Sequence, residues 1–472
     1  MKTQLDRSHP PAPGPAPEVH LATHAAEELS NGMRLIVVED HKLPLVSVQI
    51  RFDVPPITQG EKVGYIDMIG ELLATGAAAR NKVDIDHTVD ELGATFFASN
   101  DGVFAGALKK NLAPLMDLLR DVVQFPTFPE EEFEKLRVRF RSSVQQRSED
   151  PEAIAEVVGR SVTFGERHPY GEVMTLKTIE QIERATIAAY HRHFFRPEKA
   201  YLVFVGDITE QEARDLAEAH FSLWRPQPSN ATVDGAGRTI VDGLGPLNVL
   251  QQAVVPSGIR RIFVVDRPGA AQSVIRVVFP LGILPKDPRA QQAQVMNTVL
   301  GGGVFNARLM QNLREKRGYT YGAHSSLDVD RFNSSFTAMT SVRTEVTGSA
   351  VAEILSEIEG MRKERVTDEE LELSKRSMMG SFGRSLEDPK TVARFALNTE
   401  LNGLRADHYR TYLSRLESVT AQEVQEAAVA FLHPDQATIL VVGDMAQVKG
   451  GLAVLGKETG VPVLQLSEEG HH

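Results

Sequence analysis

The sequence predicts an α+β protein in which one type of domain is used twice. Segment 192–213 (RHFFRPEKAYLVFVGDITEQEA) is matched by 430–448 (AFLHPDQATILVVGDMAQV), where Phe, Pro, Val, Gly and Asp recur at a constant offset of 237 residues. The alternating, strand-like segments 47–52 and 273–279 are each followed by a loop and an apolar helical stretch. A chain of 472 residues also exceeds one domain of ordinary size.

The elements of the first half follow from local patterns. Strands are expected at 33–39 and 46–52, a helix near 62–75, a hairpin at 92–109, and charged helices at about 129–148 and 151–164. Gly93 and Thr95 of the hairpin correspond to Gly318 and Thr320 at an offset of 225 residues. The second half should therefore repeat this order.

Composition sets the domain boundaries. Residues 1–30 are rich in Pro and Ala and lack the apolar segment of a secretory signal, which predicts a disordered leader. Pro, Gly, Ser and Asn gather near the start of 225–260, which predicts a linker. The remaining expected parts are an N-terminal domain, a C-terminal domain and a tail, at 31–224, 261–450 and 451–472.

Charge and composition exclude several classes of function. A net charge of −12 argues against a nucleic-acid or anionic-membrane surface. Without cysteine the chain has no disulfide, no thiolate zinc site and no cysteine nucleophile. No apolar run is long enough to span a bilayer. Because the leader also resembles what remains after removal of a signal, we expect a periplasmic location, with the cytoplasm as the alternative.

The predicted helix within GYIDMIGELLATG (64–76) carries two carboxylates one turn apart, Asp67 and Glu71, with Gly70 between them. Two oxygen ligands without imidazole would suit a hard cation better than Zn²⁺. Such a pair more often lies on a solvated helix face or pairs with a nearby Lys or Arg. We therefore expect no metal at this helix.

The string LGGGVFNARLMQNLREKRGYTYG (300–322) closely resembles the C-terminal half of the pitrilysin/insulinase superfamily of zinc peptidases, in the branch that includes mitochondrial processing peptidase. The internal repeat and the SEDP (148–151) and HPYG (168–171) segments resemble that family too, so the likeness covers about residues 30–450. It implies two duplicated domains, each an antiparallel sheet flanked by helices, which together form half of a clamshell around a peptide chamber.

Active members of that family carry His-x-x-Glu-His on a helix of the first half and a second glutamate farther along as the third zinc ligand. In the alignment that the resemblance implies, Asp67 replaces the first His, Gly70 the catalytic Glu, and Glu71 the second His. The third ligand falls near Ser142 and Ser143, where no carboxylate is present. The resemblance thus implies a chain without zinc.

In the same alignment, the chain keeps an Arg and a Tyr seven positions apart, Arg314 and Tyr321. In the family, the matching residues bind substrate at the partner's zinc site. An Arg can grip a substrate carbonyl, and a Tyr hydroxyl can donate to an oxyanion. Without the resemblance, Arg314 would be expected to pair with Glu315, and Tyr321 to be a half-buried strand residue. Two-residue spacing would put Tyr319 on the same strand face as Tyr321.

Other candidates are weaker. Gly301, Gly302 and Gly303 predict a loop that contacts substrate or acts as a hinge within the family interpretation, and a flexible turn without it. No P-loop lysine follows them, so phosphate binding is not expected. The histidines show no convincing replacement site: they stand in the leader, at a helix end, alone, or in a tag-like terminus (His20, His24, His191, His193, His87, His168, His471, His472).

The leading hypothesis is a catalytically silent subunit of a heterodimeric zinc metalloendopeptidase, inactive alone. A homologous active subunit would supply zinc, this chain would supply Arg314 and Tyr321, and the substrates would be unfolded or short peptides. A homodimer is expected when the chain is alone. The alternative is a non-enzymatic scaffold or assembly subunit that resembles the core proteins of respiratory complexes. An autonomous hydrolase would need a nucleophile or metal cluster that the sequence does not show.

Overall fold

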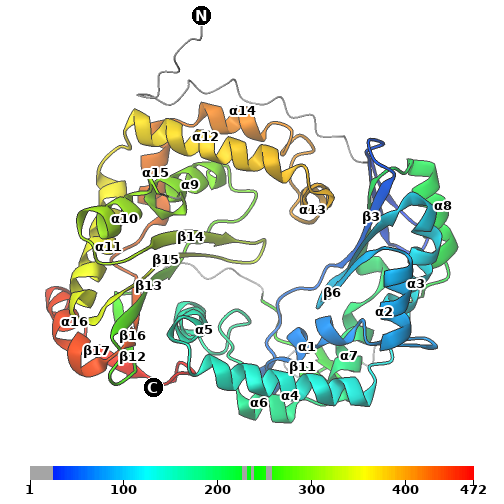
Figure 1. The fold of residues 1–472 in the computed structure, drawn as a ribbon, viewed down its shortest axis with the longest axis horizontal. Coiled ribbons are helices and arrows are strands. Elements are labelled where there is room, and N and C mark those ends of the chain that lie inside the picture. Colours follow the sequence, from blue (N-terminus) through cyan, green and yellow to red (C-terminus); the bar gives the residue numbers. More distant parts are fainter. Residues whose placement is uncertain (1–24, 226–230, 235–238, 251–257, 304, 472) are drawn as a thin grey trace, which may run out of the picture.

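The protein is described by a computed structural model, which covers residues 25–225, 231–234, 239–250, 258–303 and 305–471. These residues form two halves, each built on one six-stranded sheet with helices packed around it. The halves face each other across the centre of the molecule (Figure 1). The predicted α+β duplication is confirmed.

The first sheet has the strand order β1-β2-β8-β3-β7-β6. Its neighbours are antiparallel except for β2 and β8, which run parallel. Every residue of the central strand β8 is buried, as expected for a strand covered on both faces. The strands are β1 (Ala25–Glu28), β2 (Arg34–Glu39), β3 (Leu45–Phe52), β6 (Thr95–Ser99), β7 (Gly102–Leu108) and β8 (Ala200–Gly206).

The second sheet repeats this plan in the order β14-β15-β13-β16-β12-β17. Strand β16 occupies the place of β8, between a parallel and an antiparallel neighbour. Each sheet is therefore mixed rather than purely antiparallel: β2 and β8 are parallel in the first sheet, and β12 is parallel to both β16 and β17 in the second. The strands are β12 (Arg261–Asp266), β13 (Gln272–Pro280), β14 (Ala323–Val329), β15 (Ser334–Arg343), β16 (Thr438–Gly443) and β17 (Val463–Leu466).

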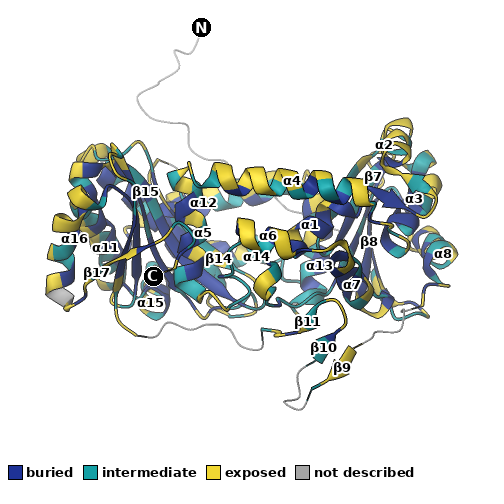
Figure 2. Cartoon of the chain, turned by 90° about the horizontal axis from the view of Figure 1, so that it is seen from below, coloured by how far each residue is buried: buried dark blue, intermediate teal, exposed yellow. Residues whose placement is uncertain are grey.

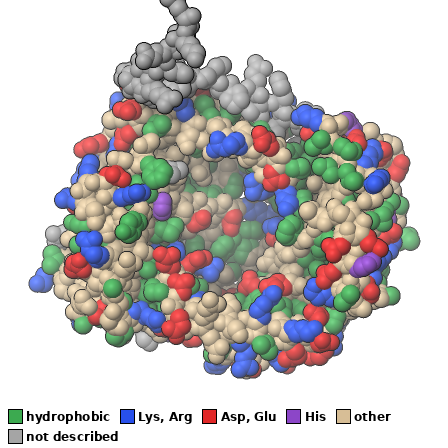
Figure 3. All heavy atoms as spheres, viewed as in Figure 1, with side chains coloured by type: hydrophobic (Ala, Val, Ile, Leu, Met, Phe, Trp, Pro, Cys, Tyr) green, Lys and Arg blue, Asp and Glu red, His purple; other side chains and the backbone are tan. Residues whose placement is uncertain are grey.

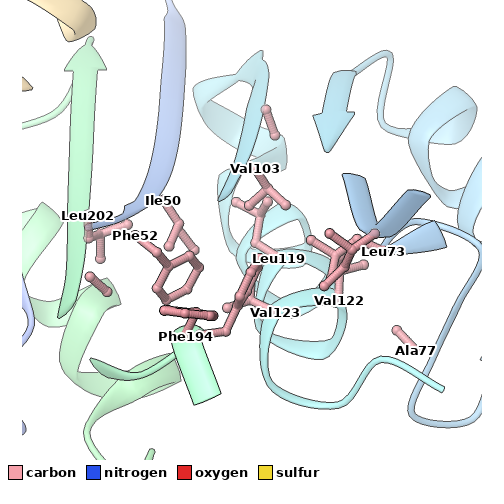
Figure 4. Close-up of a cluster of buried hydrophobic side chains, with 14 of the residues drawn as sticks. Ile50, Phe52, Leu73, Ala77, Val103, Leu119, Val122, Val123, Phe194 and Leu202 are labelled. Carbon is pink, nitrogen blue, oxygen red and sulfur yellow. The ribbon is translucent and has the colours of Figure 1, made fainter. Parts of the chain in front are cut away.

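Amphipathic helices cover the sheets and bury the two main cores. In the first half, side chains from β3, β7, β8, α3 (Leu112–Gln124) and α7 (Arg184–Phe194) meet in one cluster (Figure 4). The central strands β8 and β16 are buried, whereas the outward face of α4 (Glu130–Arg147) is exposed (Figure 2).

The helices of the first half are α1 (Tyr65–Leu72), α2 (Lys82–Glu91), α3 (Leu112–Gln124), α4 (Glu130–Arg147), α5 (Pro151–Phe164), α6 (Leu176–Gln181), α7 (Arg184–Phe194) and α8 (Glu210–Phe221). Those of the second half are α9 (Ala290–Asn297), α10 (Arg308–Met310), α11 (Thr347–Lys363), α12 (Asp368–Ser385), α13 (Pro389–Leu401), α14 (Tyr412–Ser418), α15 (Ala421–Phe431) and α16 (Met445–Thr459). None of these described helices is long and apolar enough to cross a membrane.

The ends of the expected domains differ from the structure in three places. Strand β1 lies inside the range expected as leader, and residues 1–24 fall outside the described residues. The expected linker contains a small sheet of β9 (Ala231–Val233), β10 (Thr239–Val241) and β11 (Gly245–Pro246). The expected tail is part of the fold, because β17 pairs with β12 and α16 extends to Thr459. Strands this short contain too few residues for an alternating hydrophobic pattern to be recognised in the sequence.

The glycine of the repeated Gly-Asp turn is required by close packing. Gly206 has φ +131°, and a side-chain carbon there would lie 2.1 Å from the carbonyl oxygen of Leu45. At the equivalent Gly443, such a carbon would lie 2.6 Å from the Ser273 hydroxyl. The repeat therefore marks the point where the first antiparallel strand comes against the end of the central strand.

Each half lends one helix to the sheet of the other half. Helix α5 packs on β13 and β16, and α13 packs on β8 and β2 (Figure 1). Both helices begin with the same Glu-Asp-Pro sequence: Asp150 and Asp388 are N-caps whose carboxylates accept a backbone N–H, and a Pro follows each. Sequence reasoning missed this exchange, although the tripeptide recurs in both halves.

The exchanged helices bury apolar side chains in two small cores that join the halves. Ile154 and Val158 of α5 pack with residues of the second sheet, and Leu397 of α13 packs with residues of the first sheet. Ile154 is fully buried and Leu397 nearly so. Separating the halves would expose both cores to water, which makes the exchange the main apolar link between them.

We expect Ile154→Ala and Leu397→Ala each to lower the free energy of unfolding by about 2–5 kcal/mol, because each leaves a cavity in a core between the halves. Urea unfolding of the full chain measures the loss. Leu223→Ala is the matched control: Leu223 is 88% exposed, so its change should stay within about 0.5 kcal/mol. Losses as small as the control's in both core variants would contradict this account of the exchange.

Candidate functional site

Helix α1 displays Asp67 and Glu71 on its exposed face, because Met68 and Ile69 bury the other face in the first core. Glu71 forms an ion pair with Arg139 of α4. Pairing with a neighbouring Arg is the alternative that the sequence favours over metal binding. The Glu71 carboxylate is therefore already paired with a cationic side chain of this protein.

Asp67 faces a cavity between the halves, near Arg160 of α5. Although the side chain is open to that cavity, the surrounding protein removes enough water to raise the pKa of the Asp67 carboxyl, and the charge of Arg160 partly offsets the shift. Asp67 and Glu71 thus have separate surroundings and do not act as one site.

Gly70 lies against the turn that joins β6 and β7. A side-chain carbon at this position would lie 3.0 Å from the backbone nitrogen of Asn100 and 3.2 Å from the Cα of Ser99. Both contacts are with backbone, which cannot swing aside as a flexible side chain would. A glutamate in place of Gly70 therefore requires the β6–β7 turn to move.

The expected position of the third zinc ligand offers no suitable donor. Ser142 and Ser143 are exposed on α4, and the Ser142 hydroxyl donates to the carbonyl oxygen of Val138 at 3.2 Å. Across the described residues, no group of three His, Cys, Asp or Glu side chains could hold a metal ion. This donor set does not fit Zn²⁺, which takes imidazole, thiolate or carboxylate ligands in tetrahedral geometry.

Arg314 lies in a π-helical segment, η5 (Gln311–Lys316). Its guanidinium lies over the ring of Phe305, 5.6 Å from the ring centroid, and its Nε is 3.4 Å from Oε1 of Glu315. The pairing with Glu315 is what the residues alone predict. In this single chain Arg314 is held by its own neighbours and is partly open to solvent.

Tyr321 lies in a loop rather than a strand, and its side chain is 93% exposed. The Thr320 hydroxyl donates to the carbonyl oxygen of Ser341 at 2.8 Å, so the chain turns before β14 begins at Ala323. The expectation of a shared strand face with Tyr319 is wrong for this reason. Tyr319 instead packs against the second core.

The glycine segment is explained by packing. Gly301 and Gly302 belong to the π-helical segment η4 (Thr298–Gly302). A side-chain carbon would lie 2.5 Å from the Ser325 hydroxyl at Gly301, 2.5 Å from the Asn297 amide nitrogen at Gly302, and 2.8 Å from the Thr298 carbonyl oxygen at Gly303. Glycine is thus needed for close approach. Contact with substrate stays a prediction.

The histidines have separate surroundings. His191 is buried among apolar residues, its Nε2 is 2.8 Å from the carbonyl oxygen of Val123, and burial lowers its pKa to about 4. His168 stacks on Phe164, while His87 and His471 pair with Glu91 and Glu166. His193 lies near the end of α7, and burial lowers its pKa. His20, His24 and His472 lie outside the described residues.

A cavity of about 1180 Å³ opens between the halves and is visible as the hollow at the centre of Figure 3. Its lining includes Asp67 and Arg160 and, at the tip of the β14–β15 hairpin, Asp330 and Arg331. Arg314 and Tyr321, both described, are not among its lining residues. Of the residues predicted from the sequence, Asp67 therefore lines this cavity, whereas Arg314 and Tyr321 lie outside its lining.

Two contacts tie the β14–β15 tip to the first half beside this cavity. The Tyr170 hydroxyl donates to Asp330 at 2.5 Å, and Arg331 forms an ion pair with Asp53 at the end of β3. Sequence reasoning used the HPYG segment only as part of a resemblance and missed this contact of Tyr170. The sequence of the hairpin tip, Asp330-Arg331, does not indicate that these side chains contact residues more than a hundred positions away.

Comparison with known proteins matches residues 181–378 to the peptidase M16 inactive domain. The chain is 25% identical to an uncharacterized zinc protease of Mycobacterium leprae over 425 residues, 86% of this chain and 88% of the relative. It is 24% identical to one of Mycobacterium tuberculosis (85% and 89%). A non-peptidase homolog of Helicobacter pylori is 19% identical over 430 residues (88% and 93%).

Two solved structures have a similar fold. A peptidase M16 inactive domain from Pseudomonas fluorescens has a TM-score of 0.78 at 21% identity, covering 89% of this chain and 98% of that one. A protease from Helicobacter pylori also has a TM-score of 0.78, at 18% identity, covering 90% and 100%. The predicted resemblance to the pitrilysin/insulinase zinc peptidases is confirmed by the match of residues 181–378 to the peptidase M16 inactive domain and by the relatives named zinc proteases.

Proposed function

We propose that this chain is the catalytically silent subunit of a heterodimeric zinc metalloendopeptidase. The observation that carries the proposal is Gly70, which the resemblance aligns with the catalytic glutamate: a side chain there would lie within 3.0–3.2 Å of the backbone of Ser99 and Asn100, which would have to shift. With Glu71 paired to Arg139 and serines at the expected position of the third ligand, the described residues offer no metal cluster at which water could be activated.

The exposure of Arg314 and Tyr321 supports a role toward a second chain. Tyr321 is 93% exposed, and its hydroxyl has no hydrogen-bond partner among the described residues. An exposed Tyr and a partly exposed Arg are residue types that protein interfaces favour. In the proposed complex, the partner supplies zinc, Arg314 grips a substrate carbonyl, and Tyr321 donates to the oxyanion of the tetrahedral intermediate.

The central cavity supports a role in enclosing substrate. Its lining mixes carboxylates and guanidiniums from both halves, and its volume would admit an extended peptide segment but no folded domain. We propose that the cavity forms one side of a chamber for unfolded or short peptides, closed by the partner. The periplasmic location and the homodimer of the chain alone stay predictions.

The proposal is tested by purifying the chain alone and together with a homologous subunit that carries the intact His-x-x-Glu-His motif. Cleavage of internally quenched peptides and zinc content are measured for both samples. Cleavage and one zinc per chain are expected only in the complex. Cleavage with stoichiometric zinc in the isolated chain would overturn the proposal.

Introducing the His-x-x-Glu-His residues into α1 should not create a working zinc site. We expect the triple variant Asp67→His/Gly70→Glu/Glu71→His to bind less than stoichiometric zinc and to cleave no peptide when purified alone. The Glu side chain meets the β6–β7 turn, and the expected position of the third ligand on α4 carries Ser142 and Ser143. Zinc is measured by elemental analysis after dialysis.

The double variant Asp67→His/Glu71→His is the control for this experiment, because it leaves the contact at Gly70 intact. If the triple variant held one zinc per chain and cleaved peptide, the steric argument at Gly70 would be wrong.

In the complex, we expect Tyr321→Phe to lower kcat on the order of 100-fold, because one donor to the oxyanion is lost. Arg314→Ala should lower kcat/KM on the order of 10-fold or more through loss of a charge-assisted hydrogen bond. Zinc content and assembly should not change. Steady-state peptide cleavage and size-exclusion chromatography measure these quantities.

Arg317→Ala and Tyr319→Phe are the matched controls, because they lie in the same segment but pair with Glu353 and pack on the core, respectively. Unchanged turnover in the Arg314 and Tyr321 variants would favour the scaffold function instead.

A further inference from the structure

We propose that Phe305 is the positioning residue for Arg314, holding its guanidinium at the ring so that its two Nη groups stay available for a substrate carbonyl. This inference rests on the proposed function of Arg314 in a peptidase complex. It concerns a residue that the sequence did not single out, in the segment between the three glycines and the Arg314 helix.

The position of Phe305 is not explained by packing. Its side chain is 60% exposed, and it belongs to neither of the two main cores formed by the described residues. An exposed phenylalanine loses the contacts that make the side chain favourable in a core. The contact that the structure shows for its ring is the guanidinium of Arg314, 5.6 Å from the ring centroid.

The backbone around Phe305 is fixed, so the ring is a firm support. Gln311 donates from its side-chain amide to the carbonyl oxygen of Phe305 at 2.7 Å. Three residues later, Arg308 makes a two-pronged ion pair with Glu370, at 2.7 and 3.0 Å. Together these contacts hold the segment against η5 and α12.

The chemistry of the contact decides which groups of Arg314 remain available. A guanidinium donates hydrogen bonds in its own plane, whereas an aromatic ring attracts its charge through the flat face. Contact through the ring face therefore does not use the in-plane N–H donors. Glu315 lies 3.4 Å from Nε and engages that side of the guanidinium. Phe305 and Glu315 together thus hold Arg314 while its two Nη groups stay available for substrate.

The contact is tested first in the isolated chain, with arginine-selective ¹⁵N labelling. The Nε–H signal of Arg314 is assigned by its disappearance in Arg314→Lys. Phe305→Leu should shift this signal, because the ring current is lost, and Phe305→Trp should keep a ring-current shift. Phe125→Leu is the control, since Phe125 is an exposed phenylalanine of the first half. An Arg314 signal that does not move in Phe305→Leu would overturn the proposal.

The consequence is tested in the complex with the active subunit, using internally quenched peptides. Phe305→Leu should raise KM about two- to fivefold at unchanged kcat, as expected for one exposed cation–π contact that acts on binding. Phe305→Tyr should restore the wild-type KM, because it keeps the aromatic face, and Phe125→Leu should not change it. A KM that is unchanged in Phe305→Leu, or raised equally in Phe305→Tyr, would overturn the role of the ring.

Turnover of the Arg314 and Phe305 variants separates the function of Arg314 from the role of Phe305. If Arg314→Ala itself leaves turnover unchanged, both the function of Arg314 and the role of Phe305 are wrong. If Arg314→Ala lowers kcat/KM while Phe305→Leu has no effect on KM, the proposed function stands and the role of Phe305 alone is wrong.

Discussion

The exchange of helices α5 and α13 between the two sheets is the constraint on which the rest of the structure depends. Each helix covers a sheet face that belongs to the other half, so neither half can bury its central strand alone. Because α5 is held on the second sheet, Arg160 comes to lie near Asp67 of α1. The hollow between the halves, with its mixed charges, is a consequence of this arrangement (Figure 3).

The helix that carries Asp67, Gly70 and Glu71 is closely packed against its neighbours. The β6–β7 turn lies against Gly70, and Arg139 of α4 neutralises Glu71. These contacts make the helix an integrated part of the first domain, so single substitutions of its residues act on packing as well as on charge.

Arg314 and Tyr321, unlike Gly70 and Glu71, keep functional groups open to solvent. Arg314 satisfies its charge with Phe305 and Glu315, and Tyr321 extends from a loop held by Thr320. Nothing in the described chain uses the Tyr321 hydroxyl, and the segment is firmly held on both sides. Rigid support combined with exposed functional groups is what preorganised binding by a second molecule requires.

The sequence by itself determined the α+β duplication, the strands around 46–52 and 273–279, and helices α4 and α5, because each has a local pattern or a characteristic spacing. Only the tertiary structure decided which sheet α5 and α13 cover, although Glu-Asp-Pro begins both helices. It also decided the pairing of β17 with β12 and the loop conformation of Tyr321. These features depend on contacts between segments far apart in the chain, which leave no periodicity in the residues that make them.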